Sequence, residues 1–411
     1  MLNNLSRIQL GNTKSLCFER KEKERRTRNI ELSKYRDLQK IHGQGVNVLD
    51  LDQTENRYLL SGGADGVCAI YDTYNLSKSL CYTTPTVCTV GRSNRHVHKF
   101  SVYTVQWYTF DTGMFITSGA DKLMKIWDTN TLKPADEFEF SDIVYSHHMS
   151  PIANSHALIA VGTNSTKIKL VDLKTGSASH ILKGHNGPIY AVKWSPREEY
   201  VLASGSQDNK VRLWDIRSAK GSLMVLDKNN VADVSNSKSS ASAHSSAVNG
   251  LCFTADGLHL LTFGIDKKLR LWKTSDGKNT NIEYGDIGNN NKKAVHLAVS
   301  QNCSNDLVYV PNHHDIDVME IKTGDWVKTL RGHYGQVNCC IYDSNWQELY
   351  SGANDRNILT WIPQLETERA YDTHILQQKA EKSKKGMATY NDEAPVDHVI
   401  EVTADTWSDE D

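Results

Sequence analysis

The amino-acid sequence predicts an all-β fold: a seven-bladed β-propeller with a short N-terminal helical arm and a disordered acidic C-terminal tail. Three observations support this prediction. One pattern of four residues recurs five times along the 411 residues of the chain. Two weaker copies fill the gaps between these recurrences. Every copy also contains short strand-like runs separated by turn residues, as the blades of a propeller do.

The recurring pattern is a histidine, a serine or threonine, an aspartate and an aromatic residue. The aspartate lies 22 or 23 residues after the histidine, four after the hydroxyl residue and six before the aromatic residue. Such regular spacing indicates a repeated structural unit. The five copies are His42, Ser61, Asp65 and Tyr71; His98, Thr117, Asp121 and Trp127; His185, Ser204, Asp208 and Trp214; His244, Thr262, Asp266 and Trp272; and His333, Ser351, Asp355 and Trp361.

The two weaker copies span residues 158–172 and 307–321. The first carries Ser165 and Val171 in place of the aspartate and the tryptophan, and the second carries Met319 in place of the tryptophan. Because the polar pattern is lost, we expect these two blades to rely on apolar packing. Counting them gives seven units, whose strand ends fall near residues 72, 128, 172, 215, 273, 320 and 362.

Each unit is expected to contain four antiparallel strands. Runs such as YAVKW, YVLASGS and KVRLWDI are short and rich in β-branched and aromatic residues, and a fourth run precedes each repeat histidine. The last unit stops at Ile362 without a fourth run, whereas KYRDLQKIHG near the N-terminus aligns with one. We therefore predict a closing strand at about residues 34–41, which leaves no open sheet edge in the last blade.

The GH…S/T…D…W pattern resembles that of the WD-repeat (WD40) family over about residues 34–362. The resemblance implies that the four side chains bond together inside each blade, as a satisfied buried network. A Ser-His-Asp hydrolase uses similar residues, but five copies of a triad argue against catalysis. The common catalytic motifs are absent, and the pairs His147-His148 and His313-His314 lack a third ligand at zinc spacing. We expect no enzymatic activity, no metal and no cofactor.

Composition limits the partners. The net charge of −2 provides no basic field of the kind that dominates nucleic-acid affinity, so direct nucleic-acid binding is not expected. The first residues lack the apolar core of a signal peptide, and no later run approaches 18 apolar residues, so no membrane association is expected. The eight cysteines form no CxxC pair, which fits a reducing intracellular setting.

Residues 1–30 are predicted to form a helical arm. Leu2, Leu5 and Ile8 recur every three residues as an apolar stripe, and the basic run that starts near Ser15 predicts a second helix. Two interpretations stay open: a frayed, solvated N-terminus, or an arm that docks its apolar stripe in a groove of a partner.

Two further segments lie outside the repeat pattern. Residues 228–243 are rich in serine and asparagine and are predicted to form a flexible loop. Residues 363–411 are predicted to form a disordered polar and acidic tail, because residues 392–411 hold eight acidic residues and no lysine or arginine.

Arg217 is the residue that the repeat does not explain. Among the aspartates that end the third strands, only Asp215 is followed two residues later by an arginine. That arginine would either stabilise the turn or make bidentate and stacking contacts with a partner. Trp214, Asp215 and Arg217 resemble the WDxR box of substrate receptors of cullin-4 RING ubiquitin ligases. This resemblance implies contacts with the ligase adaptor, damage-specific DNA-binding protein 1, by Leu2, Leu5, Ile8, Trp214, Asp215 and Arg217.

Stretches such as MLNNLSRIQLG, DIVYSHHMSPI and NWQELYSGANDRNIL are similar to the Cockayne syndrome group A family of these receptors; residues 228–243 and 364–390 match it poorly. The family resemblance implies a nuclear, non-catalytic substrate receptor in transcription-coupled nucleotide excision repair. The implied substrate is the Cockayne syndrome group B ATPase at stalled RNA polymerase II, presented by proximity rather than by chemistry. The alternative is a general WD-repeat scaffold in chromatin or signalling complexes, which requires neither the arm nor Arg217.

Overall fold

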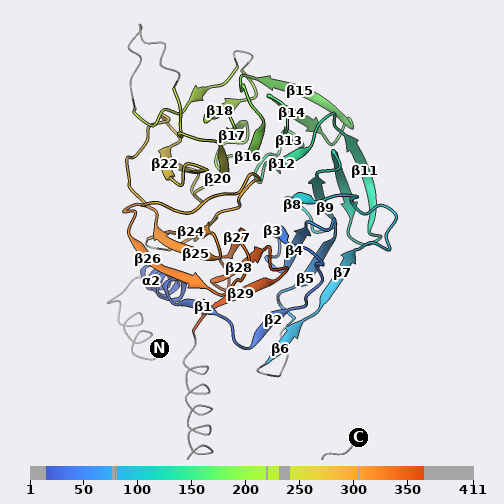
Figure 1. The fold of residues 1–411 in the computed structure, drawn as a ribbon, viewed down its shortest axis with the longest axis vertical. Helices are drawn as coiled ribbons and strands as arrows, with labels where there is room; N and C mark the ends of the chain where they lie inside the picture. Colours follow the sequence, from blue (N-terminus) through green and yellow to red (C-terminus); the bar gives the residue numbers. More distant parts are fainter. Residues whose placement is uncertain are drawn as a thin grey trace, which may run out of the picture. The chain divides into compact units, whose positions relative to one another are not determined.

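A computed structural model describes residues 15–75, 79, 81–218, 221–230, 241–303 and 305–364. These residues form eight β-sheets, of which seven surround a common axis as blades and one is a separate two-stranded sheet, with one helix beside the last two blades (Figure 1). The seven-bladed propeller predicted from the repeat spacing is therefore confirmed. The predicted acidic tail lies almost entirely outside the described residues. None of the helices in the described part of the chain is long and apolar enough to span a membrane.

The first four blades follow the repeat units in order, and each runs from an inner to an outer strand. Most residues of their inner strands are buried, so both faces of these strands are covered. Blade 1 contains β3 (Val46–Leu51), β4 (Tyr58–Gly63), β5 (Cys68–Asp72) and β7 (Thr86–Val90). Blade 2 contains β8 (Val102–Trp107), β9 (Met114–Gly119), β10 (Leu123–Asp128) and β11 (Lys133–Glu139). Blade 3 contains β12 (Val144–Met149), β13 (Leu158–Thr163), β14 (Lys167–Asp172) and β15 (Ser177–Lys183). Blade 4 contains β16 (Ile189–Trp194), β17 (Val201–Ser206), β18 (Val211–Asp215) and β19 (Met224–Val225).

The last three blades are less regular. Blade 5 has three strands, and its fourth position is represented by a single bridge between Trp272 and Asn279. The described ends of the predicted loop 228–243 are held in place, because Asn230 exchanges hydrogen bonds with Asn279. Blade 5 contains β20 (Val248–Phe253), β21 (His259–Gly264) and β22 (Leu269–Lys273). Blade 6 contains β23 (Ala298–Val299), β24 (Leu307–Asn312), β25 (Asp315–Glu320) and β26 (Trp326–Arg331). Blade 7 contains β27 (Val337–Asp343), β28 (Glu348–Ala353), β29 (Ile358–Pro363) and β1 (Ile30–Leu32).

The N-terminal segment completes the last blade, but the predicted position of the closing strand is wrong. The strand is β1, in which Ile30 pairs with Pro363 and Leu32 pairs with Trp361. Residues 36–38 instead form β2 (Arg36–Leu38), which runs parallel to β6 (Tyr82–Thr84) outside the blades. The physical reason is that Ile30 is fully buried in the core of the last two blades, whereas the polar segment after β1 has other partners.

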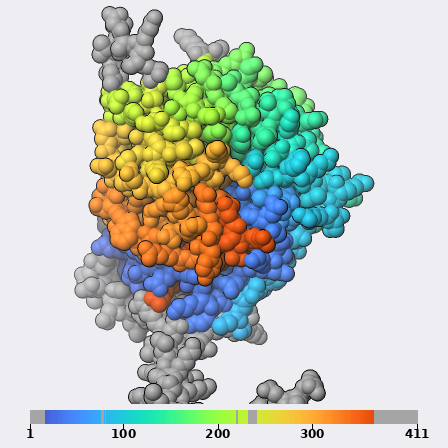
Figure 2. Space-filling model, viewed as in Figure 1, coloured from blue at the N-terminus to red at the C-terminus, as the bar shows by residue number. Residues whose placement is uncertain are grey.

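One of those partners is a buried ion pair. The guanidinium of Arg36 lies 2.8 Å from the Glu348 carboxylate of blade 7 and also donates to the backbone carbonyl of Thr73 in blade 1. This ion pair directs β2 away from the sheet and ties the first blade to the last. In Figure 2 the blue first blade accordingly lies beside the orange and red last blade.

The two degenerate blades differ from one another. Blade 3 is packed as expected, with Ile168, Leu170 and Val171 buried in its apolar core. Blade 6 buries Met319 but also contains a different polar chain. There Asn312 donates to Asp317 at 2.6 Å, and the Thr329 hydroxyl donates to the other oxygen of Asp317 at 2.7 Å. The prediction of apolar packing alone is therefore incomplete for blade 6.

Candidate partner-binding face

The predicted blade network forms in blade 4. His185 lies between two partners: its Nδ1 is 2.9 Å from Asp208 Oδ2, and its Nε2 is 2.7 Å from Ser204 Oγ. The indole N–H of Trp214 donates to the same hydroxyl at 2.8 Å. Because the histidine, the hydroxyl and the indole are all buried, the chain of hydrogen bonds satisfies groups that would otherwise be costly to desolvate.

The same arrangement recurs in blades 2, 5 and 7. Blade 1 has the histidine link, with His42 Nε2 2.8 Å from Ser61 Oγ, but its aromatic residue differs: the Tyr71 hydroxyl donates to the Gln39 carbonyl. The other three blades have the same three contacts: histidine Nδ1 to aspartate, histidine Nε2 to hydroxyl, and indole nitrogen to hydroxyl. In that order, the distances are 2.7, 2.6 and 2.8 Å in blade 2 (His98, Asp121, Thr117 and Trp127). They are 2.8, 2.7 and 2.9 Å in blade 5 (His244, Asp266, Thr262 and Trp272), and 2.9, 2.8 and 2.7 Å in blade 7 (His333, Asp355, Ser351 and Trp361).

The network carboxylates are held ionised. Burial alone would raise the pKa of Asp208, but hydrogen bonds from His185 and from the amides of Asn186 and Lys210 outweigh it and lower the pKa to about 2. The same balance lowers the pKa of Asp355 to about 2. These groups are already hydrogen-bonded to one another inside each blade. The histidine, serine and aspartate side chains therefore hold the blades together.

The other histidine candidates also have local partners. His147 Nδ1 lies 2.6 Å from the Ser118 hydroxyl, and His148 Nδ1 accepts the backbone amide of Trp194 at 3.0 Å. Across the described part of the chain, no three histidine, cysteine, aspartate or glutamate side chains are placed to hold a metal ion. Trp107 and Trp194 are buried in blade cores, so neither provides a stacking surface.

Arg217 follows the third strand of blade 4 and is fastened to its own turn. Its guanidinium donates to both oxygens of Asp215, at 3.0 and 2.7 Å, and lies 4.6 Å from the ring centroid of Tyr200. The hydrogen bonds from Arg217 lower the pKa of Asp215. The arginine therefore does stabilise the turn. Since its side chain is 61% exposed, solvent screens this surface pair, which adds little to stability and leaves the guanidinium accessible.

Blade 1 contains a close counterpart. Arg57, from the turn between its first and second strands, donates to both oxygens of Asp72 at 2.9 and 2.7 Å. Its guanidinium lies 5.2 Å from the ring centroid of Tyr58. A bidentate arginine at the end of a third strand is thus not unique to blade 4. What distinguishes Arg217 is its place two residues after the aspartate.

One end of the propeller carries the turns between first and second strands and between third and fourth strands. We call it the Arg217 face; it includes residues 195–200, 216–218 and 344–347. The helix α2 (Ser15–Arg28) packs on this face. Arg26 donates to the Trp346 carbonyl at 3.2 Å, the Thr27 hydroxyl lies 2.8 Å from the Tyr342 hydroxyl, and Arg28 pairs with Glu320 at 3.1 Å. The predicted second helix of the arm and Arg217 therefore share one face.

The Arg217 face also carries exposed apolar side chains that the sequence did not single out. Tyr74 and Trp346 contact each other edge to face, with centroids 5.7 Å apart, across the junction of blades 1 and 7. Nothing in the local sequence marks such residues, because their exposure depends on how seven blades place their turns. Exposed apolar groups gathered on one face indicate an interaction surface. The six in turns of this face are Tyr74, Phe110, Ile152, Leu223, Leu258 and Trp346.

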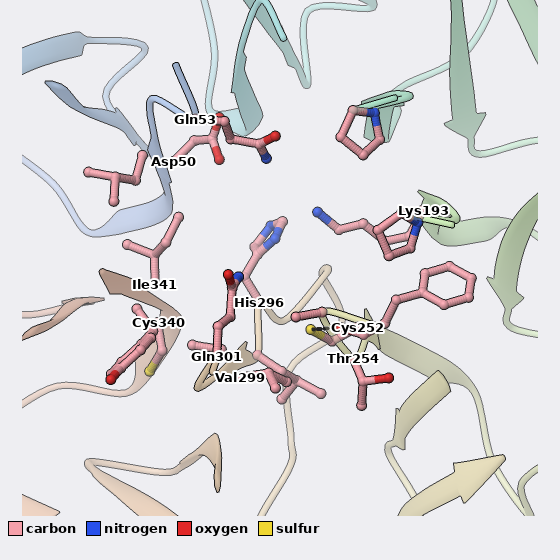
Figure 3. A pocket seen from close by; sticks show the side chains of 18 of the residues that line it. Asp50, Gln53, Lys193, Cys252, Thr254, His296, Val299, Gln301, Cys340 and Ile341 are labelled. Carbon is pink, nitrogen blue, oxygen red and sulfur yellow. Dashed lines mark hydrogen bonds between the residues drawn. The ribbon is translucent and has the colours of Figure 1, made fainter. Parts of the chain in front are cut away.

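The first-strand ends enclose a cavity of about 480 Å³ that reaches the turns of the Arg217 face (Figure 3). Asp50, Lys193 and His296 project into it from different blades. Leu2, Leu5 and Ile8, predicted to contact the adaptor, lie outside the described residues. Of the predicted adaptor contacts, the structure describes Trp214, which is buried in the core, and Asp215 with Arg217, which lie at the surface.

Comparison with known proteins agrees with this geometry. The WD domain, G-beta repeat model matches residues 91–128, 176–215, 235–273 and 324–361, which hold the complete networks of blades 2, 4, 5 and 7. Radiation-sensitive protein 28 of Saccharomyces cerevisiae is 27% identical over 43% of this chain and 38% of its own length. Autophagy-related protein 16 of Arabidopsis thaliana is 23% identical over 68% of this chain and 50% of its own length.

A longer match comes from WD repeat-containing protein ATCSA-1 of Arabidopsis thaliana. It is 34% identical over 425 aligned residues, which cover 86% of this chain and 93% of the relative. The match therefore extends over both complete and degenerate blades. On this basis, the chain belongs to the family of WD-repeat proteins that includes ATCSA-1.

Proposed function

We propose that this chain is a substrate-recognition subunit of a cullin-4 RING ubiquitin ligase, of the Cockayne syndrome group A type, that acts in transcription-coupled nucleotide excision repair in the nucleus. The observation that carries the proposal is the placement of α2 and Arg217 on one face, together with exposed apolar turns. The names of the relatives ATCSA-1 and Radiation-sensitive protein 28 support a role in repair.

The proposed adaptor, damage-specific DNA-binding protein 1, binds the Arg217 face. Arg217 is held in place by Asp215 and Tyr200 before any partner arrives, so little side-chain entropy is lost when it is buried. Arginine and aromatic side chains with this degree of order are typical interface hot spots. The helix α2 packs on the same face, and Leu2, Leu5 and Ile8 precede it in the sequence; their apolar stripe is proposed to enter a groove of the adaptor.

The substrate is proposed to bind the opposite face. That face carries Phe100 and Tyr334, which are 62% and 91% exposed, and it stays accessible when the adaptor covers the Arg217 face. The proposed substrate is the Cockayne syndrome group B ATPase at stalled RNA polymerase II. The receptor contributes proximity: it holds the substrate near the ubiquitin-charged enzyme and takes no part in bond making.

The test compares two exposed, ion-paired arginines at opposite ends of the propeller. Arg331, the last residue of β26, lies away from the Arg217 face and pairs with Asp315 at 3.6 Å. Full-length Arg217→Ala and Arg331→Ala variants are each titrated with the purified adaptor, and the dissociation constants are compared with that of the wild type. Loss of an interface hot spot is expected to weaken the Arg217→Ala complex about tenfold or more, while Arg331→Ala changes affinity less than about twofold. Equal affinity for all three proteins would favour the alternative function, a general WD-repeat scaffold.

A further inference from the structure

The central cavity is closed at the end away from the Arg217 face by one segment of chain, residues 289–296. Lys293 Nζ lies 5.1 Å from the ring centroid of Tyr103 in blade 2, Asn291 donates to Asn338 in blade 7 at 3.1 Å, and the Val295 amide donates to Asn249 in blade 5. A segment that contacts three blades in this way crosses the axis. The cavity of about 480 Å³ is thus a blind pocket, within the size range of small-ligand sites.

The fifth residue of the inner strand is polar in blades 1 to 4, and in three of these blades it joins two blades together. Asp50 accepts the Trp107 amide at 2.7 Å, and His148 accepts the Trp194 amide at 3.0 Å. Gln106 likewise accepts a hydrogen bond from the Met149 amide at 2.7 Å. Each of these side chains offers an acceptor to the next inner strand.

Lys193 occupies the same fifth place on β16, where it departs from this rule. An ammonium has three donors and no acceptor, so it cannot form the inter-blade bond. Within the part of the chain that the structure describes, its Nζ has no hydrogen-bond acceptor and no carboxylate at ion-pair distance; Asp50 acts on it only through longer-range attraction. Figure 3 shows the ammonium end of Lys193 pointing into the pocket.

A second polar group is left unsatisfied beside it. His296, from the segment that closes the pocket, places its ring between Asp50 and Lys193 (Figure 3). Its Nε2 is buried and has no hydrogen-bond partner among the described residues. The half-buried Lys193 ammonium faces the pocket rather than a protein acceptor, and the unused imidazole nitrogen of His296 costs stability. Two polar groups without protein partners beside one cavity are suited to a polar ligand.

We propose that this blind pocket binds a small oxyanion, a carboxylate or a phosphate, with the Lys193 ammonium as its counter-charge. The neutral His296 ring donates its one proton toward the Tyr103 carbonyl, so its free Nε2 is an acceptor. An oxyanion supplies the acceptor that the ammonium lacks, and the hydroxyl of a hydrogen phosphate can also donate to the His296 Nε2. This assignment is independent of the adaptor proposal, because it concerns the chain alone.

Asp50 on the opposite wall makes this binding depend on pH. Burial raises the pKa of Asp50 to about 7. The ionised Asp50 carboxylate repels an anion bound opposite it, so the bound anion favours the protonated form of Asp50. Anion binding is therefore expected to take up protons and to tighten as the pH falls from 8 to 6. The titratable and charged groups that face Asp50 from the surrounding elements are Lys193, Asp52, His148, His296, Cys252 and Cys340. Burial lowers the pKa of the two histidines and raises the pKa of the two cysteines, so these four groups stay neutral between pH 6 and 8.

The experiment is calorimetric titration of the full-length chain with inorganic phosphate and, separately, with acetate, at constant ionic strength and pH 6.5. Saturable one-to-one binding of either probe is expected, and the probe that binds identifies the chemistry. Lys193→Met is expected to weaken binding at least tenfold, and Lys174→Met, which removes an exposed lysine, by less than twofold. Asp50→Asn is expected to keep binding and, for acetate, whose charge is constant over this range, to remove its dependence on pH between 6 and 8.

Two results would overturn the proposal: no saturable binding of either probe, or equal affinity in Lys193→Met and the wild type. Thermal melting checks that the variants fold. Lys193→Met removes a half-buried cation without an ion-pair partner, so its melting temperature is expected to stay close to that of the wild type. If Lys193→Met nevertheless fails to fold, a pH profile that is identical in Asp50→Asn and the wild type contradicts the proposed site.

Discussion

At the scale of single residues, the blade networks depend on one hydroxyl each. In blade 4 the Ser204 oxygen lies 2.7 Å from the His185 ring and 2.8 Å from the Trp214 indole nitrogen. A serine oxygen can accept two hydrogen bonds and donate one, so a single small side chain joins two large ones. The pattern of four residues therefore predicted real contacts, since the histidine meets both the aspartate and the hydroxyl, and the tryptophan meets the same hydroxyl.

Removal of that hydroxyl should destabilise the propeller. Ser204→Ala leaves both the indole N–H and the imidazole nitrogen buried without a partner, and we expect the free energy of unfolding to fall by about 1–3 kcal/mol. Ser165→Ala is the matched control in degenerate blade 3, where the hydroxyl contacts only its neighbours Thr163 and Lys167, and a change below about 0.5 kcal/mol is expected. Urea unfolding measures both; equal losses would show that the network does not account for the cost.

Asp50 allows a second test at this scale. Its pKa in the folded chain, about 7, is raised by burial above the ordinary value of 3.8. At any pH between 3.8 and about 7, the folded chain therefore keeps a proton on Asp50 that the unfolded chain has lost. The free energy of unfolding falls as the pH rises through this range. Asp50→Asn abolishes this penalty. We expect the variant to be more stable than the wild type at pH 8, with the advantage shrinking as the pH falls from 7 to 4. A constant difference across melting curves at these pH values would contradict the assignment.

At the scale of elements, closure of the ring depends on the short strand β1. Ile30 is fully buried among residues of blades 6 and 7, whereas Leu32, two residues later, is 37% exposed. Ile30→Ala is expected to lower the free energy of unfolding by about 2–5 kcal/mol, and Leu32→Ala by a smaller amount. Denaturant unfolding of the two variants makes the comparison. A larger loss for Leu32→Ala would mean that β1 does not anchor the last blade through Ile30.

The error in the position of β1 has a physical explanation. Repeat spacing constrains the segment between a histidine and its aromatic residue, because all four network residues must meet. It does not constrain what precedes the first histidine. There the chain inserts β2, held by the buried pair of Arg36 and Glu348, and this pair lies 312 residues apart in sequence. Alignment of short apolar runs alone cannot distinguish the two arrangements.

At the scale of the whole molecule, the propeller brings together residues that the sequence separates widely. Asp50 and Lys193 come from blades 1 and 4 and His296 from the segment 289–296, and Tyr74 meets Trp346 across the ring closure. Because such groupings exist only once the ring is closed, the repeat predicted the scaffold but neither the pocket nor the apolar turns of the Arg217 face. Arg217 itself was visible in the sequence because it departs from the other strand ends. The contact with Tyr200 from a neighbouring turn, which helps to hold the Arg217 side chain in place, was not visible in the sequence.

The most direct test of the proposed function is hydrogen–deuterium exchange of the full-length chain, free and bound to the adaptor. The proposal places the adaptor on the Arg217 face. Slower exchange is therefore expected in the backbone amides of residues 195–200, 216–218 and 344–347 and in the described helix Ser15–Arg28, while the loops around Phe100 and Tyr334 on the opposite face keep their exchange rates. Protection confined to the loops around Phe100 and Tyr334, with residues 216–218 and 344–347 unchanged, would contradict it.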